Sequence, residues 1–588
     1  MKFQRLSLLA CLLVPVVGAA EISASDTIVV TATRTETPIS DAIVPVTVIS
    51  RDDIELSGAT DLAELLRFQA GIDIGRNGGP GQATSVFLRG TESNHTLVLV
   101  DGVRMNPGTI GGGAIQHITP EIIERVEIVK GARSALFGTD AIGGVINIIT
   151  RRPQGTEAQF GAGGGSFGSQ SAFASAGHRG GGSEIGITVD WADTDGYSPL
   201  KAVDIDRGYD NLSVSVFGSR AIGSATVTAR HWSASGNVEY LDFFGNPIDQ
   251  DFRNSTTAVE WQQRVSEAGR SKLIVSYIQD EIDQNQVADF VHSDRMSLDW
   301  QYSHALDNHT LTAGIFLMDE TAETLSFGSG FDEDTDVRAL FVQDQWSRDK
   351  HRAFAAIRFS DHETYGNETT WNVEYAYDLS GSLTASIGAG HAFRAPDATD
   401  RFGFGGNVNL KPEVADEIQA GIRYRPASRH SIDFELYSND IEDLIGFDET
   451  FTAVNVAEAE IRGAQLGYEY TGDTFTFRSE FVRQTAEDKA TGSRLLRRAE
   501  ETLAMSYTQS IGEHRLGLSV LASGDREDFG GTSLAGYVLA NLTGQIRLGD
   551  KLRLNARLEN LLDTDYETAA GFRMQERSAF VELRYSWK

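Results

Sequence analysis

A two-residue alternation of apolar and polar side chains runs through most of this chain and limits its possible folds more than any other feature. In the last segment Val581, Leu583, Tyr585 and Trp587 fall on one face of an extended strand, with polar residues between them. Similar alternation occurs at 552–558, 516–520 and 432–436, and helical periodicity is almost absent from residue 151 onward. Strands with one apolar and one polar face predict either a transmembrane barrel or a soluble sandwich or propeller.

The hydrophobic residues favour the barrel. Beyond the first 20 residues no run of 18 apolar residues occurs, which excludes helical membrane spans. Hydrophobic residues make up 40% of the chain, a fraction that suits barrel strands because their lipid-facing side chains alternate with polar ones. No repeat of propeller-blade length is visible. Divided among 22 strands, residues 151–588 give about 20 residues per strand and connection, as a transmembrane barrel requires.

The amino terminus has the sections of a secretory signal peptide. Lys2 and Arg5 precede an apolar run at 6–17, and small residues follow up to Ala20, which predicts cleavage after that residue. Cys11 also allows a lipoprotein cleavage site, although the apolar stretch before it is very short. Cleavage after Ala20 leaves a mature chain without cysteine, and therefore without disulfides or thiolate metal sites.

The chain is strongly acidic, with a formal net charge of -32. This charge repels nucleic acid and excludes it as a partner. The carboxylates serve either as solvated loop residues or as ligands for divalent cations. Four candidates for Ca²⁺ lie in two predicted long loops: Asp204, Asp206, Asp242 and Asp251.

Residues 38–150 have the pattern of a compact α/β unit. Strands are predicted at 46–49, 85–88, 96–100, 126–129 and 145–149, and a short helix within 57–69. The glycine-rich loops at 75–81 and 108–113 are too long for simple connectors and are of the kind that binds ligands. No nucleophile elbow G-x-S-x-G occurs between a strand and a helix, so nothing in the chain supports an enzyme.

A short apolar patch precedes this unit. It consists of Asp26, Thr27, Ile28, Val29, Val30, Thr31 and Ala32. Its β-branched residues favour an extended strand, which could pair with the sheet edge of a partner protein or be the first strand of the following domain.

Several motifs resemble those of the TonB-dependent outer-membrane receptors. In the amino-terminal unit they read VFLRG at 86–90, LVLVDGVR at 97–104, IERVEIVKG at 123–131 and GGVINIIT at 143–150. Later segments, FRAP at 393–396, NVNLKPE at 407–413 and NLLDTDY at 560–566, are similar to barrel motifs of the same family. The resemblance implies a mainly β protein: a 22-stranded antiparallel transmembrane β-barrel with an N-terminal α/β plug domain inside it.

The family resemblance also implies an organisation and a set of partners. Residues 1–20 are the signal peptide, 21–37 the TonB box segment, 38–150 the plug and 151–588 the barrel. The patch at 26–32 is then the TonB box, whose partner is TonB of the TonB-ExbB-ExbD complex. The protein is expected to be a monomer, surrounded by lipid of the outer membrane of a Gram-negative bacterium, and to transport a scarce nutrient actively into the periplasm.

Within the family the likeness is greatest to cobalamin receptors, which implies a corrinoid ligand. The substrate contacts implied are Ala83, Ser85, Glu92, Ile110 and Gly111, and the implied cofactor is Ca²⁺ at the four aspartates named above. The small residues of the loop at 78–82 are expected to offer hydrogen-bonding groups to the ligand. A ferric siderophore or other metallophore is the alternative ligand, and ordinary solvated loops are the alternative reading of both residue sets.

One departure concerns the contact between plug and barrel. Gln465 stands where the family often has a glutamate. The sequence therefore leaves open whether Arg89 or Arg133 of the plug forms a charged pair with the barrel.

Overall fold

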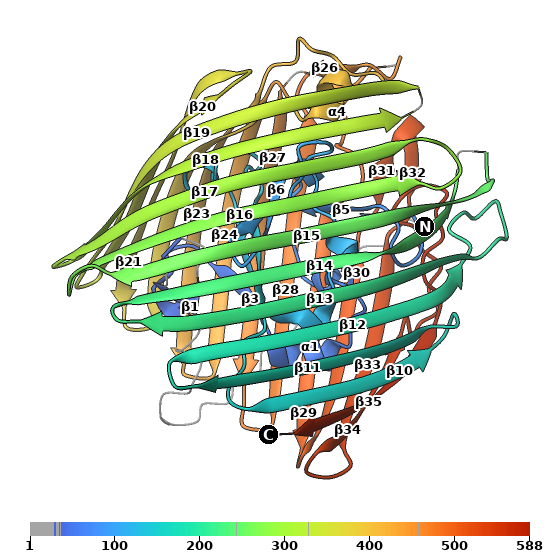
Figure 1. Cartoon of the computed structure of the whole chain (residues 1–588), viewed down its shortest axis with the longest axis horizontal. Coiled ribbons are helices and arrows are strands. Elements are labelled where there is room, and N and C mark those ends of the chain that lie inside the picture. Colours follow the sequence, from blue (N-terminus) through green and yellow to red (C-terminus); the bar gives the residue numbers. More distant parts are fainter. Residues whose placement is uncertain are drawn as a thin grey trace.

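The computed structural model describes residues 29–30, 34–35, 37–242, 244–326, 328–448, 450–456 and 458–587. The predicted signal peptide and residues 26–28 and 31–32 of the predicted TonB box lie outside these residues. The described chain forms a closed barrel that surrounds a smaller amino-terminal domain, drawn in blue in Figure 1. No helix among the described residues is long and apolar enough to cross a bilayer.

The plug is built on a five-stranded sheet in the order β3-β8-β9-β6-β7. Its strands are β3 (Val46–Ser50), β6 (Thr96–Val100), β7 (Val103–Arg104), β8 (Ile123–Lys130) and β9 (Gly144–Thr150), and a separate hairpin pairs β4 (Ile72–Arg76) with β5 (Thr84–Leu88). The helices are α1 (Arg51–Ser57), α2 (Leu62–Arg67) and α3 (Ser134–Phe137), with 3-10 turns η2 (Ile39–Asp41), η3 (Ser93–His95), η4 (Ile115–His117) and η5 (Pro120–Ile122). Every plug strand predicted from the sequence is present.

The short helix predicted within 57–69 is present as α2, and a second helix, α1, that the sequence did not predict lies just before it. Ser50 caps α1, because its side chain accepts from the backbone N–H of Asp53 while the Asp53 carboxylate accepts from the backbone N–H of Ser50. Gly58 ends this helix in a left-handed conformation with φ 62°. Asp61 then caps α2 by accepting from the backbone N–H of Glu64. The capping residues, rather than the apolar spacing alone, therefore set the helix boundaries.

The barrel has 22 antiparallel strands, and its last strand pairs with its first. The first eleven are β10 (Glu157–Gly165), β11 (Gln170–Gly180), β12 (Ser183–Tyr197), β13 (Arg207–Ile222), β14 (Ala225–Leu241), β15 (Pro247–Arg264), β16 (Gly269–Gln284), β17 (Phe290–Leu306), β18 (His309–Ser326), β19 (Ser329–Arg348) and β20 (His351–His362). The others are β21 (Gly366–Ser380), β22 (Leu383–Arg394), β23 (Glu413–Ala427), β24 (His430–Glu442), β27 (Ala459–Thr471), β28 (Phe475–Asp488), β29 (Glu501–Ile511), β30 (His514–Ser523), β33 (Tyr537–Arg547), β34 (Leu552–Glu559) and β35 (Ser578–Trp587).

The predicted two-faced pattern of the last strand is confirmed. The four apolar residues predicted to share one face are exposed, between 41% and 55% accessible: Val581, Leu583, Tyr585 and Trp587. Arg584, on the other face, is buried inside the barrel. A side chain that is exposed on the outer wall of such a barrel faces lipid, and its neighbours in sequence face the lumen. The sequence alternation therefore gives the correct register.

The two ends of the barrel differ in the length of their connections. At one end strands are joined by short turns, such as 181–182, 223–224 and 307–308. At the other end lie the long connections 198–206, 395–412, 443–458, 489–500, 524–536 and 560–577, some of which carry short elements: α4 (Ala398–Phe402), β25 (Ile445–Phe447), β26 (Ala453–Asn455), β31 (Arg526–Asp528), η6 (Phe529–Gly531) and β32 (Thr532–Leu534). Short periplasmic turns and long extracellular loops are the general rule for such barrels, so the long connections mark the extracellular end.

Candidate functional site

The plug residues predicted to contact substrate lie on neighbouring loops at the extracellular end. Ser85 lies on β5, whose Val86 N–H donates to the Ser93 hydroxyl at 3.1 Å and so fixes β5 against η3. A Cβ added to Gly111 would lie 3.1 Å from the Cβ of Asn94, which places the 110–112 loop against the same turn. The structure therefore brings the segments around 83–85, 92–94 and 110–112 into one continuous surface.

The exposure of these residues is uneven. Ala83 and Ile110 are exposed, and Ile110 keeps 49% of its surface accessible. Ser85 and Glu92 are half-buried, whereas Gly111 is buried and its carbonyl accepts from the Asn106 amide at 2.8 Å. The surface thus offers apolar and small polar groups on a backbone that its own hydrogen bonds hold in place.

The negative charge of Glu92 is paired. Arg498, in the extracellular connection between β28 and β29, lies 2.5 Å from the Glu92 carboxylate. The same guanidinium donates to the carbonyls of Gly90 and Thr91 and lies over the ring of Phe87 at 4.5 Å. A barrel loop is therefore tied to the plug beside the predicted substrate contacts, a link that sequence spacing gave no means of finding.

The glycine-rich tip at 78–82 packs closely against the barrel. A Cβ on Gly81 would overlap the ring of Tyr209, and one on Gly78 would lie 2.5 Å from the Cβ of Pro199. The Gln82 amide donates to the carbonyl of Glu239 on β14 at 2.7 Å. Gly78 and Gly81 therefore have no room for a side chain where the hairpin tip packs against the barrel, and the expectation that this loop offers hydrogen-bonding groups to a ligand stays a prediction.

The four aspartates proposed for calcium lie on neighbouring loops and strands but have separate partners. Asp242 accepts from the backbone N–H groups of Phe244 and Asn246, which closes a turn at the tip of the β14–β15 hairpin. These hydrogen bonds, led by that from the Asn246 side chain, hold the pKa of Asp242 below its usual value. Asp251 on β15 accepts from the Asn237 amide at 2.8 Å.

Asp204 and Asp206 are exposed in the connection that precedes β13. Across the described ranges, no three carboxylate, histidine or cysteine side chains are grouped in a way that could hold a metal ion. Calcium binding at these aspartates stays a prediction, and it would require the two loops to move together.

Charged pairs between plug and barrel are present despite Gln465. Arg89 lies 2.8 Å from Glu435 and 3.3 Å from Glu417, and its guanidinium stacks on the ring of Tyr437. The amide oxygen of Gln465 instead accepts from Lys130 at 3.1 Å. Arg89 therefore forms a charged pair with the barrel, and its partners are glutamates on β23 and β24.

Arg133 forms a second charged pair, 2.5 Å from Glu374 on β21. Both arginines and their glutamates are buried, so each charge depends on its partner for compensation.

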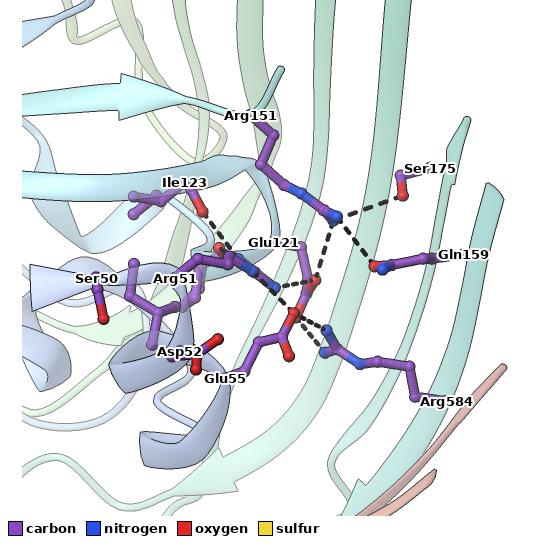
Figure 2. A network of polar contacts seen from close by, with 12 residues as sticks. Ser50, Arg51, Asp52, Glu55, Glu121, Ile123, Arg151, Gln159, Ser175 and Arg584 are labelled. Atoms are coloured by element: carbon purple, nitrogen blue, oxygen red, sulfur yellow. Dashed lines mark hydrogen bonds and ion pairs between the residues drawn. The ribbon is translucent and has the colours of Figure 1, made fainter. Parts of the chain in front are cut away.

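A further network joins the plug to the last barrel strand near the periplasmic end (Figure 2). Arg584 lies 2.6 Å from Glu121 and 3.3 Å from Glu55, while Arg51 contacts the same two glutamates at 3.0 and 3.1 Å. Burial alone would raise the pKa of Glu121, but Arg584 and Arg51 lower it to about 2. The carboxylate is therefore ionised at neutral pH and holds the base of the plug to β35.

The described part of the TonB box pairs with the segment that follows it. β1 (Val29–Val30) runs antiparallel to β2 (Thr37–Pro38), with Val29 opposite Pro38. The extended conformation predicted for this patch is therefore present at the two residues that the structure describes. These two residues pair with their own chain, and pairing with the sheet edge of a partner protein stays a prediction.

Comparison with known proteins places this architecture in a family. Residues 38–145 match the model of the TonB-dependent receptor plug domain, and residues 147–561 match that of the TonB-dependent receptor-like β-barrel. The chain therefore belongs to the TonB-dependent receptors, which are transport receptors of the outer membrane.

Particular relatives are also similar over nearly the whole chain. The vitamin B12 transporter BtuB of Vibrio vulnificus is 31% identical over 589 residues, covering 95% of each chain. BtuB of Photobacterium profundum is 29% identical over 618 residues, covering 99% of this chain and 100% of the relative. Among solved structures, the siderophore receptor PirA from Acinetobacter baumannii superposes with a TM-score of 0.81 at 17% identity, over 92% of this chain and 98% of that one. The last similarity concerns the fold alone.

Proposed function

We propose that this receptor binds a corrinoid such as vitamin B12 at its extracellular face and transports it into the periplasm with energy supplied through TonB. The observation that carries the proposal is the 31% identity over 95% of the chain to a relative named as a vitamin B12 transporter. The predicted contact surface supports it, because a large amphipathic ligand with amide groups needs apolar area and small polar groups together. Exposed Ile110 and half-buried Ser85 provide both.

The charges near this surface favour a corrinoid over an anionic ferric siderophore. An anionic chelate is recognised best by arginines that are free to donate to it. Arg498 is paired with Glu92, and Arg394 is held by Asp397, Asp400 and Glu413 at 2.6 to 2.7 Å. These arginines are already neutralised by carboxylates of the protein itself.

The test is calorimetric titration of the purified receptor with cyanocobalamin and, separately, with ferric enterobactin. We expect saturable binding of cyanocobalamin only. Ile110→Ser should weaken this binding about fivefold, because covering roughly half of an isoleucine side chain contributes about 1 kcal/mol. Val287→Ser is the matched control, because Val287 is similarly exposed, at 58%, but lies in the separate 285–289 loop of the barrel.

Binding of ferric enterobactin without cyanocobalamin would replace the corrinoid with a metallophore and leave the receptor class unchanged. Equal losses in the two variants would remove the plug surface from the binding site.

A further inference from the structure

A row of aromatic and histidine side chains crosses the outer wall of the barrel at its periplasmic end, from β18 to β21. In the strand register His309 lies opposite Trp346, and His351 lies opposite Tyr377. The ring centroid of Trp346 is 6.4 Å from that of His309 and 6.2 Å from that of His351. The ring centroids of His351 and Tyr377 are 4.8 Å apart. The four rings therefore form one continuous row.

The row faces lipid near the periplasmic surface. Leu311, two positions after His309 on β18, is 40% exposed. Val342, four positions before Trp346 on β19, is 50% exposed. Side chains an even number of positions apart share one face of a strand, so both rings lie on the same outward face as these apolar residues. The turns next to the row are short periplasmic connections, which places the row at the level of the inner-leaflet headgroups.

Both histidines of the row have one ring nitrogen engaged by the protein. Nδ1 of His309 lies 2.8 Å from a carboxylate oxygen of Asp344. Nδ1 of His351 lies 2.6 Å from the hydroxyl oxygen of Tyr375. These contacts fix the orientation of each ring. A protonated imidazole has a donor on both nitrogens, so Nε2 of each ring can then donate to an oxygen atom outside the protein.

Two cations lie directly beyond the row, where β19 turns into β20. The side chain of Arg348 is 67% exposed, and the carboxylate paired with it, that of Asp349, is 3.9 Å away. Such an exposed and distant pair contributes little. Lys350 is exposed in the same turn. Basic side chains at the membrane surface attract the headgroups of anionic lipids.

The net charge of this region depends on its histidines. Besides the two tyrosines, the titratable or charged groups around His309 and His351 lie on β17 to β19 and in the adjoining turns: His304, Asp307, Asp344, Arg348, Asp349 and Lys350. Two cations and three carboxylates leave one net negative charge while the histidines are neutral. Protonation of His309 and His351 reverses this to one net positive charge. Because histidine is the side chain that changes its charge between pH 5 and 8, a modest fall in pH reverses the sign.

A comparable histidine at the extracellular end has negative neighbours instead. His391 of β22 is stacked with Trp371 at 6.5 Å between ring centroids, and its Nδ1 lies 2.8 Å from Asp416. These contacts match those that His309 makes with a tryptophan and an aspartate. Both Asp416 and Glu368 interact electrostatically with His391. Protonated His391 therefore stays among carboxylates, and it provides a matched control.

We propose that the periplasmic rim of β18–β20, formed by His309, Trp346, Arg348, Lys350 and His351, binds the headgroup of an anionic phospholipid when the histidines are protonated. Arg348 and Lys350 attract the negative charge, and the Nε2 atoms of the histidines donate to phosphate oxygens. The Trp346 ring packs beside the lipid at the boundary between its headgroup and its acyl chains. The inference concerns the lipid around the receptor and does not depend on which ligand is transported.

Native mass spectrometry of the purified receptor in detergent micelles tests this site. The receptor is titrated with dioleoylphosphatidylglycerol and, separately, with dioleoylphosphatidylcholine, which has the same phosphate group but no net charge. Both titrations are made at about pH 8 and at about pH 5.5, on either side of the usual histidine transition. His309→Gln/His351→Gln and Arg348→Gln/Lys350→Gln are the test variants, and His391→Gln is the control. Heat-dependent gel mobility checks that each variant is folded.

In the unmodified receptor the preference for phosphatidylglycerol should rise about tenfold between the higher and the lower pH, because each positive charge near an anionic headgroup strengthens binding about fivefold. His309→Gln/His351→Gln should lose most of this rise, whereas His391→Gln should keep it. Arg348→Gln/Lys350→Gln should bind phosphatidylglycerol about tenfold more weakly at the lower pH. A preference that does not change with pH, an equal loss in His391→Gln, or unchanged binding without the two cations would each overturn the proposal.

Discussion

An arginine at position 583 tests the lipid-facing register of the barrel most directly. Leu583 is 45% exposed and is the sixth of the ten residues in β35, close to the middle of the strand. A cationic side chain on the lipid face near the midplane costs about 2–4 kcal/mol. Leu583→Arg should therefore lower the folding equilibrium constant by a factor of about 30 to nearly 1,000.

The neighbouring residue provides the control. Glu582 points to the opposite face, where it accepts from the Asn555 amide at 2.9 Å and pairs with Arg584 at 3.0 Å. Glu582→Gln keeps an acceptor oxygen and removes one of several charges in that group, so it should cost about 1 kcal/mol or less. Urea titration of the receptor refolded into lipid vesicles, followed by its shift in gel mobility on unfolding, measures both variants. Equal losses of stability would refute the assigned register.

Three further predictions concern the plug and its partners. Because the folded-state pKa of Glu121 is about 2, below the usual value near 4.3, its contribution to stability is complete above about pH 5 and is lost as the pH falls towards 2. Glu121→Gln should therefore flatten the acid side of a plot of unfolding free energy against pH, and an unchanged slope would contradict this. Val29→Pro should abolish uptake but leave surface binding intact, because proline removes a backbone donor from the strand that is proposed to pair with TonB. Val29→Ala, which keeps this donor, is the control, and normal uptake in Val29→Pro would reject the pairing. Calcium should raise the affinity for cyanocobalamin if it draws the four loop aspartates together, and identical titrations with and without chelator would exclude such coupling.

The pairing of Glu92 illustrates why the charge partners of single residues could not be predicted from the sequence. In the sequence Glu92 is simply an added negative charge in a loop that is predicted to contact substrate. In the structure Arg498, more than 400 positions later in the chain, neutralises it at 2.5 Å. The partners of Arg89 and Arg133 are found in the same way, on β23, β24 and β21 rather than at Gln465.

The sequence by itself determined the barrel, the register of its last strand and the strands of the plug. The physical reason is local: alternation with a period of two gives each strand one apolar and one polar face, which in a closed membrane barrel are the lipid and lumen faces, and β-branched runs between turn residues favour extended structure. The family motifs added the strand number and the plug within the lumen. Helix α1 was missed because the capping contacts of Ser50, and not hydrophobic spacing, decide where it begins.

Only the tertiary structure decided which plug loops pack against the barrel. Gly78 and Gly81 look like flexible ligand-binding residues in the sequence, yet they are glycines because Pro199 and Tyr209 of the barrel approach them too closely for a side chain. Closure of the barrel around the plug brings these distant residues together, and that closure determines where the plug is held by apolar packing and where by polar contacts.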